Sequence, residues 1–229
     1  HVGVTSSRPA GAWPVVGRRG SAGELHARPV ASGGRMVEVM AWRRTALVLG
    51  STQPLGDADR LAVDAIGADL VRRRSGGGAV LLRPGHDLWV DVTIPRADRL
   101  WHDDVAVSFL WLGRVWAAAL AGLGVEAAVH PGPSTTSPWS RRVCFAGLGA
   151  GEVTVGGRKV VGLSQRRTRD AARYQCLVPG SWDAAELLAL LALDEEHRDA
   201  GLAELAAVAA GTDLEPAALT AAFVAALPD

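Results

Sequence analysis

Cysteine is scarce in this sequence of 229 residues, which contains Cys144 and Cys176 and no others. Two cysteines are too few for a disulfide framework, and in a reducing compartment we expect both to be free thiols. The six histidines show no paired spacing of metal ligands, and neither cysteine belongs to a Cys-x-x-Cys motif. The sequence therefore predicts no metal site.

Net charge and long apolar runs are also missing. The 24 basic residues balance 24 acidic ones, so no overall field draws the chain to nucleic acid or to an anionic membrane. The longest uncharged apolar stretch, residues 115–125, is too short to cross a bilayer, and the N-terminal segment lacks a continuous hydrophobic signal region. We therefore expect a cytoplasmic protein with no nucleic-acid and no membrane partner.

Lysine is nearly absent, since Lys159 is the one lysine and every other basic residue is arginine. An ammonium differs from a guanidinium because it is compact and can coordinate a single buried oxygen as a point charge. Composition alone leaves two interpretations open, a functional lysine and an exposed lysine that remains by chance.

The chain divides by composition into three parts. Residues 1–35 are rich in Gly, Pro, Ser and Arg without sustained periodicity and are predicted to form a flexible N-terminal arm. Residues 36–229 are long and apolar enough to fold as a single domain around one core. The last part of that domain, residues 181–229, is rich in Ala and Leu and is predicted to be helical.

Short apolar runs between turn residues predict the strands. They fall at 36–42, 45–49, 69–73, 79–82, 87–94, 142–145, 152–155, 159–165 and 173–178. In 87–94 polar and apolar residues alternate, which is the pattern of a half-buried strand. Asp57 is expected to cap a short helix that ends at Gly67. The clearest helix is 103–120, with an apolar stripe at helical spacing that includes Val105 and Trp116. These elements indicate an α+β fold with a mostly antiparallel sheet flanked by helices.

Residues 72–80 combine three arginines with Ser75, the glycines Gly76, Gly77 and Gly78, and Ala79. Glycine amides can hold phosphate or carboxylate oxygens, and arginines can pair with the same oxygens. The alternative is a tight hairpin turn with solvated arginines. The Gly-x-x-x-x-Gly-Lys-Ser/Thr pattern is missing, so this segment is not a P-loop.

Two motifs together resemble the biotin/lipoate protein ligase superfamily, in its lipoate-protein ligase A and octanoyltransferase-like branch. The first is Arg-Arg-x-Ser-Gly-Gly-Gly-Ala-Val, which ends at Val80, and the second is Gly-Arg-Lys-Val-Val-Gly-Leu-Ser-Gln-Arg, which contains Lys159. The resemblance covers about residues 36–179. It implies a catalytic domain like that of the class II biotin/lipoate ligases.

The resemblance also implies roles for individual residues. Lys159 would bind the acyl carbonyl and phosphate oxygens and stabilise the charge that develops there. The residues expected to bind the acyl substrate are Arg73, Ser75, Gly76, Gly77, Gly78, Ala79, Gly162 and Ser164.

Cys144 has two interpretations. Octanoyl transferases resemble this chain in placing a Cys-Phe pair before a Glu-x-x-x-x-Gly-Arg-Lys segment, here Cys144, Glu152 and Lys159. A thiolate at Cys144 would form an acyl thioester without ATP. The alternative is a small core residue on a strand. For Cys176 we favour a core role.

Three functions follow from these residues. The first is a lipoate-protein ligase that forms an acyl-adenylate and needs ATP with Mg²⁺. The second is an octanoyl or lipoyl transferase that uses Cys144 and needs no cofactor, and the third is a non-catalytic acyl-binding member. The expected partners are a lipoyl carrier domain of a 2-oxoacid dehydrogenase or the glycine cleavage H protein, and an acyl carrier protein.

Overall fold

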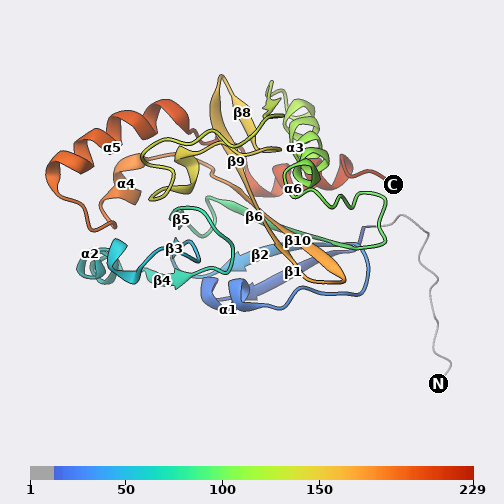
Figure 1. Cartoon of the computed structure of the whole chain (residues 1–229), viewed down its shortest axis with the longest axis horizontal. Helices are drawn as coiled ribbons and strands as arrows, with labels where there is room; N and C mark the ends of the chain where they lie inside the picture. The colour runs from blue at the N-terminus through green and yellow to red at the C-terminus, as the bar shows by residue number, and fades with distance from the viewer. Residues whose placement is uncertain (1–12) are drawn as a thin grey trace.

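The computed structural model describes residues 13–229 and contains two sheets. The larger sheet has seven strands in the order β1-β2-β6-β10-β9-β8-β7, and the smaller has three in the order β4-β3-β5. β1 runs parallel to β2 and β3 parallel to β4, whereas the other pairs are antiparallel. The expected α+β fold with a mostly antiparallel sheet is confirmed (Figure 1).

The strands closely follow the predicted runs. The large sheet consists of β1 (Val15–Gly20), β2 (Met36–Trp42), β6 (Leu88–Pro95), β7 (Ala128–Val129), β8 (Val153–Val155), β9 (Arg158–Arg167) and β10 (Ala171–Val178). The small sheet consists of β3 (Ala46–Leu49), β4 (Asp69–Arg72) and β5 (Val80–Leu82). The α-helices are α1 (Ala22–Ala27), α2 (Arg60–Ala65), α3 (Leu110–Gly122), α4 (Ala184–Leu188), α5 (Glu195–Val208) and α6 (Pro216–Ala225). Short 3₁₀ turns are η1 (Leu55–Asp57), η2 (Val107–Phe109) and η3 (Cys144–Ala146).

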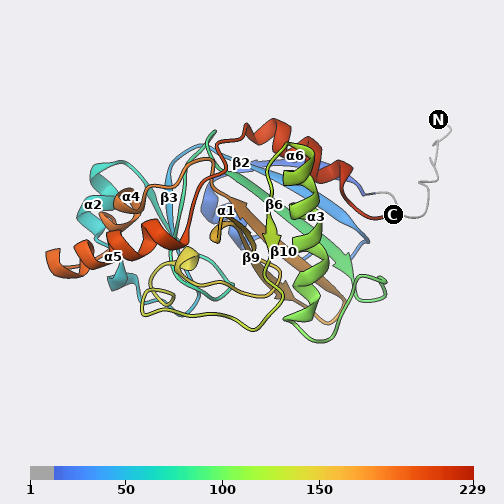
Figure 2. The same cartoon turned by 90° about the horizontal axis from the view of Figure 1, so that it is seen from above.

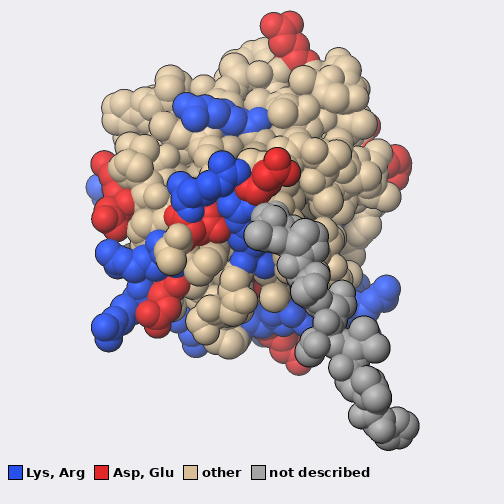
Figure 3. Space-filling view, turned by 90° about the vertical axis from the view of Figure 1, so that its right-hand side faces the viewer, with Lys and Arg blue, Asp and Glu red and all other residues tan. Residues whose placement is uncertain are grey.

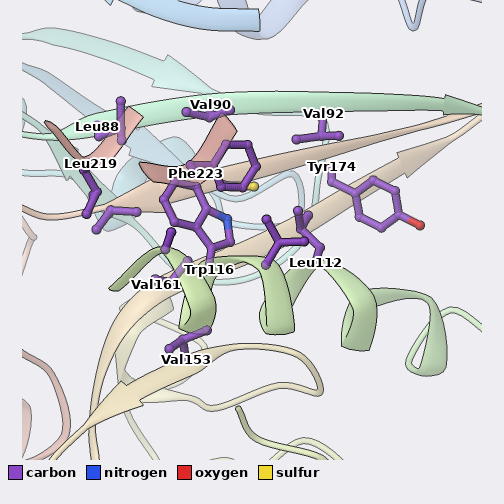
Figure 4. Close-up of a cluster of buried hydrophobic side chains, with 14 of the residues drawn as sticks. Leu88, Val90, Val92, Leu112, Trp116, Val153, Val161, Tyr174, Leu219 and Phe223 are labelled. Atoms are coloured by element: carbon purple, nitrogen blue, oxygen red, sulfur yellow. The ribbon is translucent and has the colours of Figure 1, made fainter. Parts of the chain in front are cut away.

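The two faces of the large sheet are covered differently. α3 and α6 pack on one face, and α1 lies on the opposite side (Figures 1 and 2). The core under α3 and α6 is built around Trp116, whose ring lies 4.2 Å from that of Phe223 (Figure 4). Burying these large rings removes a substantial apolar area from water, which stabilises this half of the molecule.

The prediction of a flexible arm over residues 1–35 is wrong for residues 15–27, which form β1 and α1. The first twelve residues of that prediction lie outside the described residues. Ser21 and Glu24 form a capping box at the start of α1, which satisfies amides that the first helical turn would leave unpaired. Ala22 and Leu25 are buried against the small sheet and β6.

Two helix starts and one strand differ from their predictions. The helix expected at 103–120 begins at Leu110, because Asp104 accepts hydrogen bonds from the amides of Ala106 and Val107 and makes a separate turn. Val105, expected in the core stripe, is exposed. The short helix is capped by Asp59 and not by Asp57. The strand expected at 142–145 is absent from the described structure, where η3 begins at Cys144.

The prediction that 87–94 is half-buried is also wrong, because β6 lies inside the sheet and is buried on both faces. Its polar face is compensated by partners: Asp87 pairs with Arg83 at 2.9 Å, and Asp91 lies 3.5 Å from Arg173. Burial raises the pKa of Asp91 to about 7, although the Arg173 charge acts in the opposite direction. The helical prediction for 181–229 is confirmed by α4, α5 and α6.

Charges are mixed on the surface. On the face shown in Figure 3, acidic and basic side chains lie next to one another among neutral residues. Among residues 13–229, no helix is both long and apolar enough to span a membrane.

Candidate active site

A small pocket contacts both sheets on the face of the large sheet that α1 covers. Its lining consists of His26, Arg73, Val80, Leu82, Trp89, Cys144, Phe145, Gly162, Leu163, Ser164, Gln175, Cys176 and Leu177. Six of these residues have aliphatic or aromatic side chains, and a few polar groups lie together along one wall. A concave apolar site with a few polar groups is typical of a small-ligand site.

Cys144 is half-buried and lines this pocket from the first position of η3. Its amide donates to the carbonyl of Ala79 at 3.0 Å, and the amide of Ala79 donates to the carbonyl of Arg142 at 2.7 Å. The glycine-rich segment is therefore bonded directly to the turn that carries the thiol. Cys144 is a free cysteine.

Lys159 lies behind that turn and is 2% exposed. Its ammonium is 2.6 Å from Glu152 Oε2 and donates to the carbonyls of Cys144 at 3.1 Å and Gly147 at 3.0 Å. An ammonium has three protons, so these three oxygens use all of its donors. In this structure Lys159 fixes the backbone of Cys144 and is not among the residues that line the pocket.

Glu152 extends this arrangement. Its Oε2 accepts from the amide of Gly149 at 2.7 Å and its Oε1 from the amide of Leu163 at 3.0 Å. The carboxylate therefore connects the segment after η3 to β9, and its charge is balanced by Lys159. A buried ion pair with these additional hydrogen bonds costs less to desolvate than an isolated one.

The glycine-rich loop is wrapped around Arg73. The Arg73 side chain is 5% exposed and donates from Nη2 to the carbonyls of Gly76 at 2.9 Å and Gly78 at 2.8 Å. Gly77 has a φ of 95°, a conformation that favours glycine, and a Cβ there would lie 3.6 Å from Cys144 Sγ. The loop therefore shapes the wall beside the thiol.

The two cations that the resemblance assigned to phosphate binding are already engaged. Arg73 holds carbonyls of its own loop, and Lys159 holds Glu152 and two carbonyls. Lys159 therefore has no proton left for a phosphate oxygen in this structure, whereas Arg73 still lines the pocket. Among residues 13–229, no group of three or more His, Cys, Asp or Glu side chains could hold a metal ion.

A chain of polar side chains runs along one wall of the pocket. Ser164 donates to Ser75 at 3.2 Å, Ser75 to Gln175 Oε1 at 3.4 Å, and the Gln175 amide nitrogen lies 3.4 Å from His26 Nδ1. The side chains of this wall are largely removed from solvent, since Ser75, Gln175 and His26 are all buried.

His26 and Gln175 were not among the site residues predicted from the sequence. His26 stacks on Trp89 with ring centroids 4.2 Å apart and is 7% exposed. Burial, with smaller effects from the charges of Arg73 and Arg173, lowers its pKa to about 3. The signal that could have revealed this helix is the Ser21-x-x-Glu24 capping box followed by the buried Leu25.

Cys176 is fully buried in the core with α3, and burial raises the pKa of its thiol. The prediction of a core role for Cys176 is confirmed. A thiol held in its neutral form is a poor nucleophile, so Cys176 does not suit that role.

The structure brings most of the predicted site residues together around Cys144. Arg73, Gly162 and Ser164 line the pocket with it, and a Cβ at Gly162 would lie 3.0 Å from the Phe145 ring. Other predicted residues lie beside the pocket, where they contact Ser164, Cys144 or the residue before the η3 turn. They are Ser75, Gly77, Gly78, Ala79 and Lys159. Gly76 is exposed, and a Cβ there would meet nothing within 4 Å.

Residues 31–215 match the family described as the lipoyl protein ligase A/B catalytic domain. The chain belongs to this family.

Two sequence relatives are named octanoyltransferase LipM. The one from Symbiobacterium thermophilum is 33% identical over 139 residues, which cover 58% of this chain and 49% of the relative. The one from Moorella thermoacetica is 31% identical over 160 residues, 68% of this chain and 57% of the relative. The chain thus spans about half the length of the relatives it matches.

Solved structures support the fold. A bipartite lipoate protein ligase from Thermoplasma acidophilum, solved in a study of its lipoylation system and E2 lipoyl domain, superposes with a TM-score of 0.73 at 17% identity and covers 93% of this chain and 81% of its own. A lipoate-protein ligase A bound with ATP gives a TM-score of 0.67 at 19% identity, with 94% and 83% covered. At these identities the similarity concerns the fold alone.

Proposed function

We propose that the chain is a cysteine-dependent acyltransferase that moves a lipoyl or octanoyl group from a thioester donor to a lysine of a lipoyl carrier domain. The observation that carries the proposal is the position of Cys144, half-buried in the wall of an apolar pocket, with its backbone fixed by Ala79 and Lys159. The names of the sequence relatives, which are octanoyltransferases, support the same reaction.

The reaction proceeds in two steps that balance without a nucleotide. The Cys144 sulfur attacks the thioester carbonyl carbon, the donor carbon–sulfur bond breaks, and the donor leaves as a thiol that carries the proton of Cys144. The amine of the carrier lysine then attacks the acyl thioester, an amide forms, and Cys144 is released as a thiol. The transfer is thus split into a thioester exchange and an attack by an amine on the new thioester, which is covalent catalysis by a thiolate.

The residues around Cys144 act by holding it in position. The amide of Cys144 is bonded to Ala79, and its carbonyl is bonded to Lys159, so both sides of the residue are fixed. A nucleophile held near its attack position avoids much of the entropy cost of the reaction. The aliphatic and aromatic lining supplied by Val80, Leu82 and Trp89 suits an acyl chain and excludes water.

The ligase alternative, with an acyl-adenylate made from ATP and Mg²⁺, requires free cations for the phosphate. Arg73 and Lys159 are the residues that the resemblance assigned to this task. Lys159 uses all three of its protons on oxygens of the protein, and Arg73 uses both protons of Nη2 on carbonyls of its own loop. This observation favours the transferase. The acyl acceptor is proposed to be a lipoyl domain or the glycine cleavage H protein, and the donor an acyl carrier protein thioester.

The test is a transfer assay with a purified lipoyl domain and two acyl sources, an octanoyl acyl carrier protein thioester without nucleotide in one reaction and free octanoate with ATP and Mg²⁺ in the other. We expect octanoylated lysine from the thioester without ATP, a loss on the order of a thousandfold or more in Cys144→Ser, and retained transfer in the control Cys176→Ser. Product that forms only from free octanoate with ATP, and equally well in Cys144→Ser, would instead establish the ligase.

A further inference from the structure

The pocket has two ends, which the strand pairing locates. Gly162 of β9 pairs with Leu177 of β10, and Leu177 pairs with Trp89 of β6, so these residues form one row across three strands. Gly162 lies against Phe145, the neighbour of Cys144, whereas Trp89 lies against His26. Strands are about 4.8 Å apart, so roughly 10 Å separate the two ends.

An acyl chain on Cys144 that follows the pocket lining would run along this row. An extended chain of eight carbons, with bonds of about 1.5 Å, spans roughly 9 Å. Such a chain would lie over Leu177 and end beside Trp89 and His26, which both line the pocket. The distal end of the acyl group, and not its carbonyl, would thus meet His26.

The distal end of the pocket contains two polar side chains, Gln175 and His26, that are bonded to each other. Gln175 uses its Oε1 to accept from Ser75, so its amide nitrogen faces His26 and donates to Nδ1. A neutral imidazole that accepts at Nδ1 carries its proton at Nε2. His26 Nε2 is buried and has no hydrogen-bond partner among residues 13–229. A buried donor without a partner is destabilising, and such groups call for an explanation.

The ring stays neutral under physiological conditions. Burial lowers the pKa of His26 to about 3, so the ring is not an imidazolium that would attract a carboxylate. The stacked contact with Trp89 at 4.2 Å fixes the orientation of the ring. His26 lines the pocket, so the site contains one neutral, oriented N–H group whose nitrogen has less than 1 Å² of exposed surface.

We infer that His26 selects acyl chains that carry a hydrogen-bond acceptor near the distal end, over the plain octanoyl chain. This inference rests on the proposed function. Two chemical groups could supply the acceptor, the sulfur of a lipoyl dithiolane ring and the oxygen of a terminal hydroxyl. A plain octanoyl chain would leave the N–H of His26 unpaired. The Trp89 ring favours the lipoyl group further, because sulfur packs well against aromatic edges.

The experiment compares the coenzyme A thioesters of octanoate, 8-hydroxyoctanoate and lipoate, with the rate of acylation of Cys144 followed by intact mass. The wild-type protein is expected to react about tenfold faster with the hydroxylated or lipoyl donor than with the octanoyl donor. A preference for lipoyl alone identifies sulfur as the acceptor, and a preference for both identifies any acceptor at that position.

His26→Phe is the decisive variant, because phenylalanine keeps a ring on Trp89 but removes the N–H group. The ratio between acceptor-bearing and plain donors should fall to about one in His26→Phe and remain above one in His26→Gln, which keeps a side-chain N–H. A purely structural role for His26 would lower all three rates together and leave the ratio unchanged. Equal wild-type rates, or an unchanged ratio in His26→Phe, would overturn the inference.

Binding of the three free acids to Cys144→Ala separates this inference from the proposed function. If no donor acylates Cys144 but lipoate or 8-hydroxyoctanoate binds more tightly than octanoate in a His26-dependent manner, the transferase is wrong and the selection by His26 stands. If the three acids bind alike, the selection is wrong.

Discussion

Lys159 is held by three oxygens from two stretches of chain, the carboxylate of Glu152 and the carbonyls of Cys144 and Gly147. The side chains of Lys159 and Glu152 are 3% and 7% exposed, so each charge depends on the other. At the residue scale this pair explains why a single lysine persists in a chain that otherwise uses arginine: a compact ammonium fits among three converging oxygens, whereas a guanidinium does not.

Breaking this pair should be costly. Lys159→Met is expected to lower the free energy of unfolding by about 3–5 kcal/mol, because it leaves the Glu152 carboxylate buried without its partner. The double variant Lys159→Met/Glu152→Gln should lose less than the sum of the two single variants. Denaturant unfolding of the four proteins measures the coupling, and simple additivity would show that the two side chains do not depend on each other.

His26 provides a pH test. Its pKa is about 3 in the folded protein and 6.5 in the unfolded chain, so below pH 6.5 the unfolded chain binds a proton that the folded protein refuses. Stability therefore falls as pH falls from 6.5 towards 3, by up to about 1.4 kcal/mol per pH unit.

His26→Gln lacks this dependence. As pH falls from 6.5 towards 3, the unfolding free energy of the wild type should therefore decrease relative to that of the variant. Asp91 has a raised pKa and acts in the opposite direction, because its contribution to stability is lost as pH rises from 3.8 to about 7. Both proteins contain Asp91, so its contribution cancels in the difference between them. Parallel stability curves for the two proteins would show that His26 is not buried in neutral form.

At the scale of elements, the site depends on close contact between the glycine-rich loop and the η3 turn. A Cβ at Gly78 would lie 2.4 Å from the amide nitrogen of Val143, the residue before Cys144. The sequence indicated the loop, because three consecutive glycines remove every side chain from it. It could not indicate that the loop faces Val143, since that contact joins residues far apart in the chain.

Gly78→Ala should therefore displace Val143 and Cys144 together. We expect a loss of a few kcal/mol in unfolding free energy and slower acylation of the thiol, because something must shift to admit the methyl group. Gly76→Ala is the matched control for stability, since a Cβ at Gly76 meets nothing within 4 Å. If the two variants unfold at the same denaturant concentration, the close packing of loop and turn is incorrect.

The sequence pattern also gave wrong predictions where the interaction partners are far apart in the chain. The alternation in β6 indicated a half-buried strand, yet its polar face is buried because Asp91 meets Arg173, which lies on β10. Cys144 was expected on a strand and lies on a 3₁₀ turn, since the backbone of Ala79 takes the place of a regular strand partner. Local periodicity carries no information about either partner.

At the scale of the whole molecule, the two sequence motifs meet at one pocket, with Arg73 and Gly77 on one side of Cys144 and Gly162 and Ser164 on the other. The order and spacing of these motifs were enough to predict the family, and the pattern of apolar runs predicted the α+β fold. The composition of the N-terminal segment did not predict its structure. There β1 extends the large sheet and α1 places His26 at the pocket.

The central claim is that Cys144 carries the acyl group covalently, and the most direct test is to trap that intermediate. The protein is mixed with octanoyl coenzyme A without nucleotide, quenched in acid and analysed by intact mass and peptide mapping. The account predicts one acyl group on Cys144, absent in Cys144→Ala and present in Cys176→Ala. An unmodified Cys144, together with an acyl-adenylate in a parallel reaction that contains free octanoate, ATP and Mg²⁺, would contradict it.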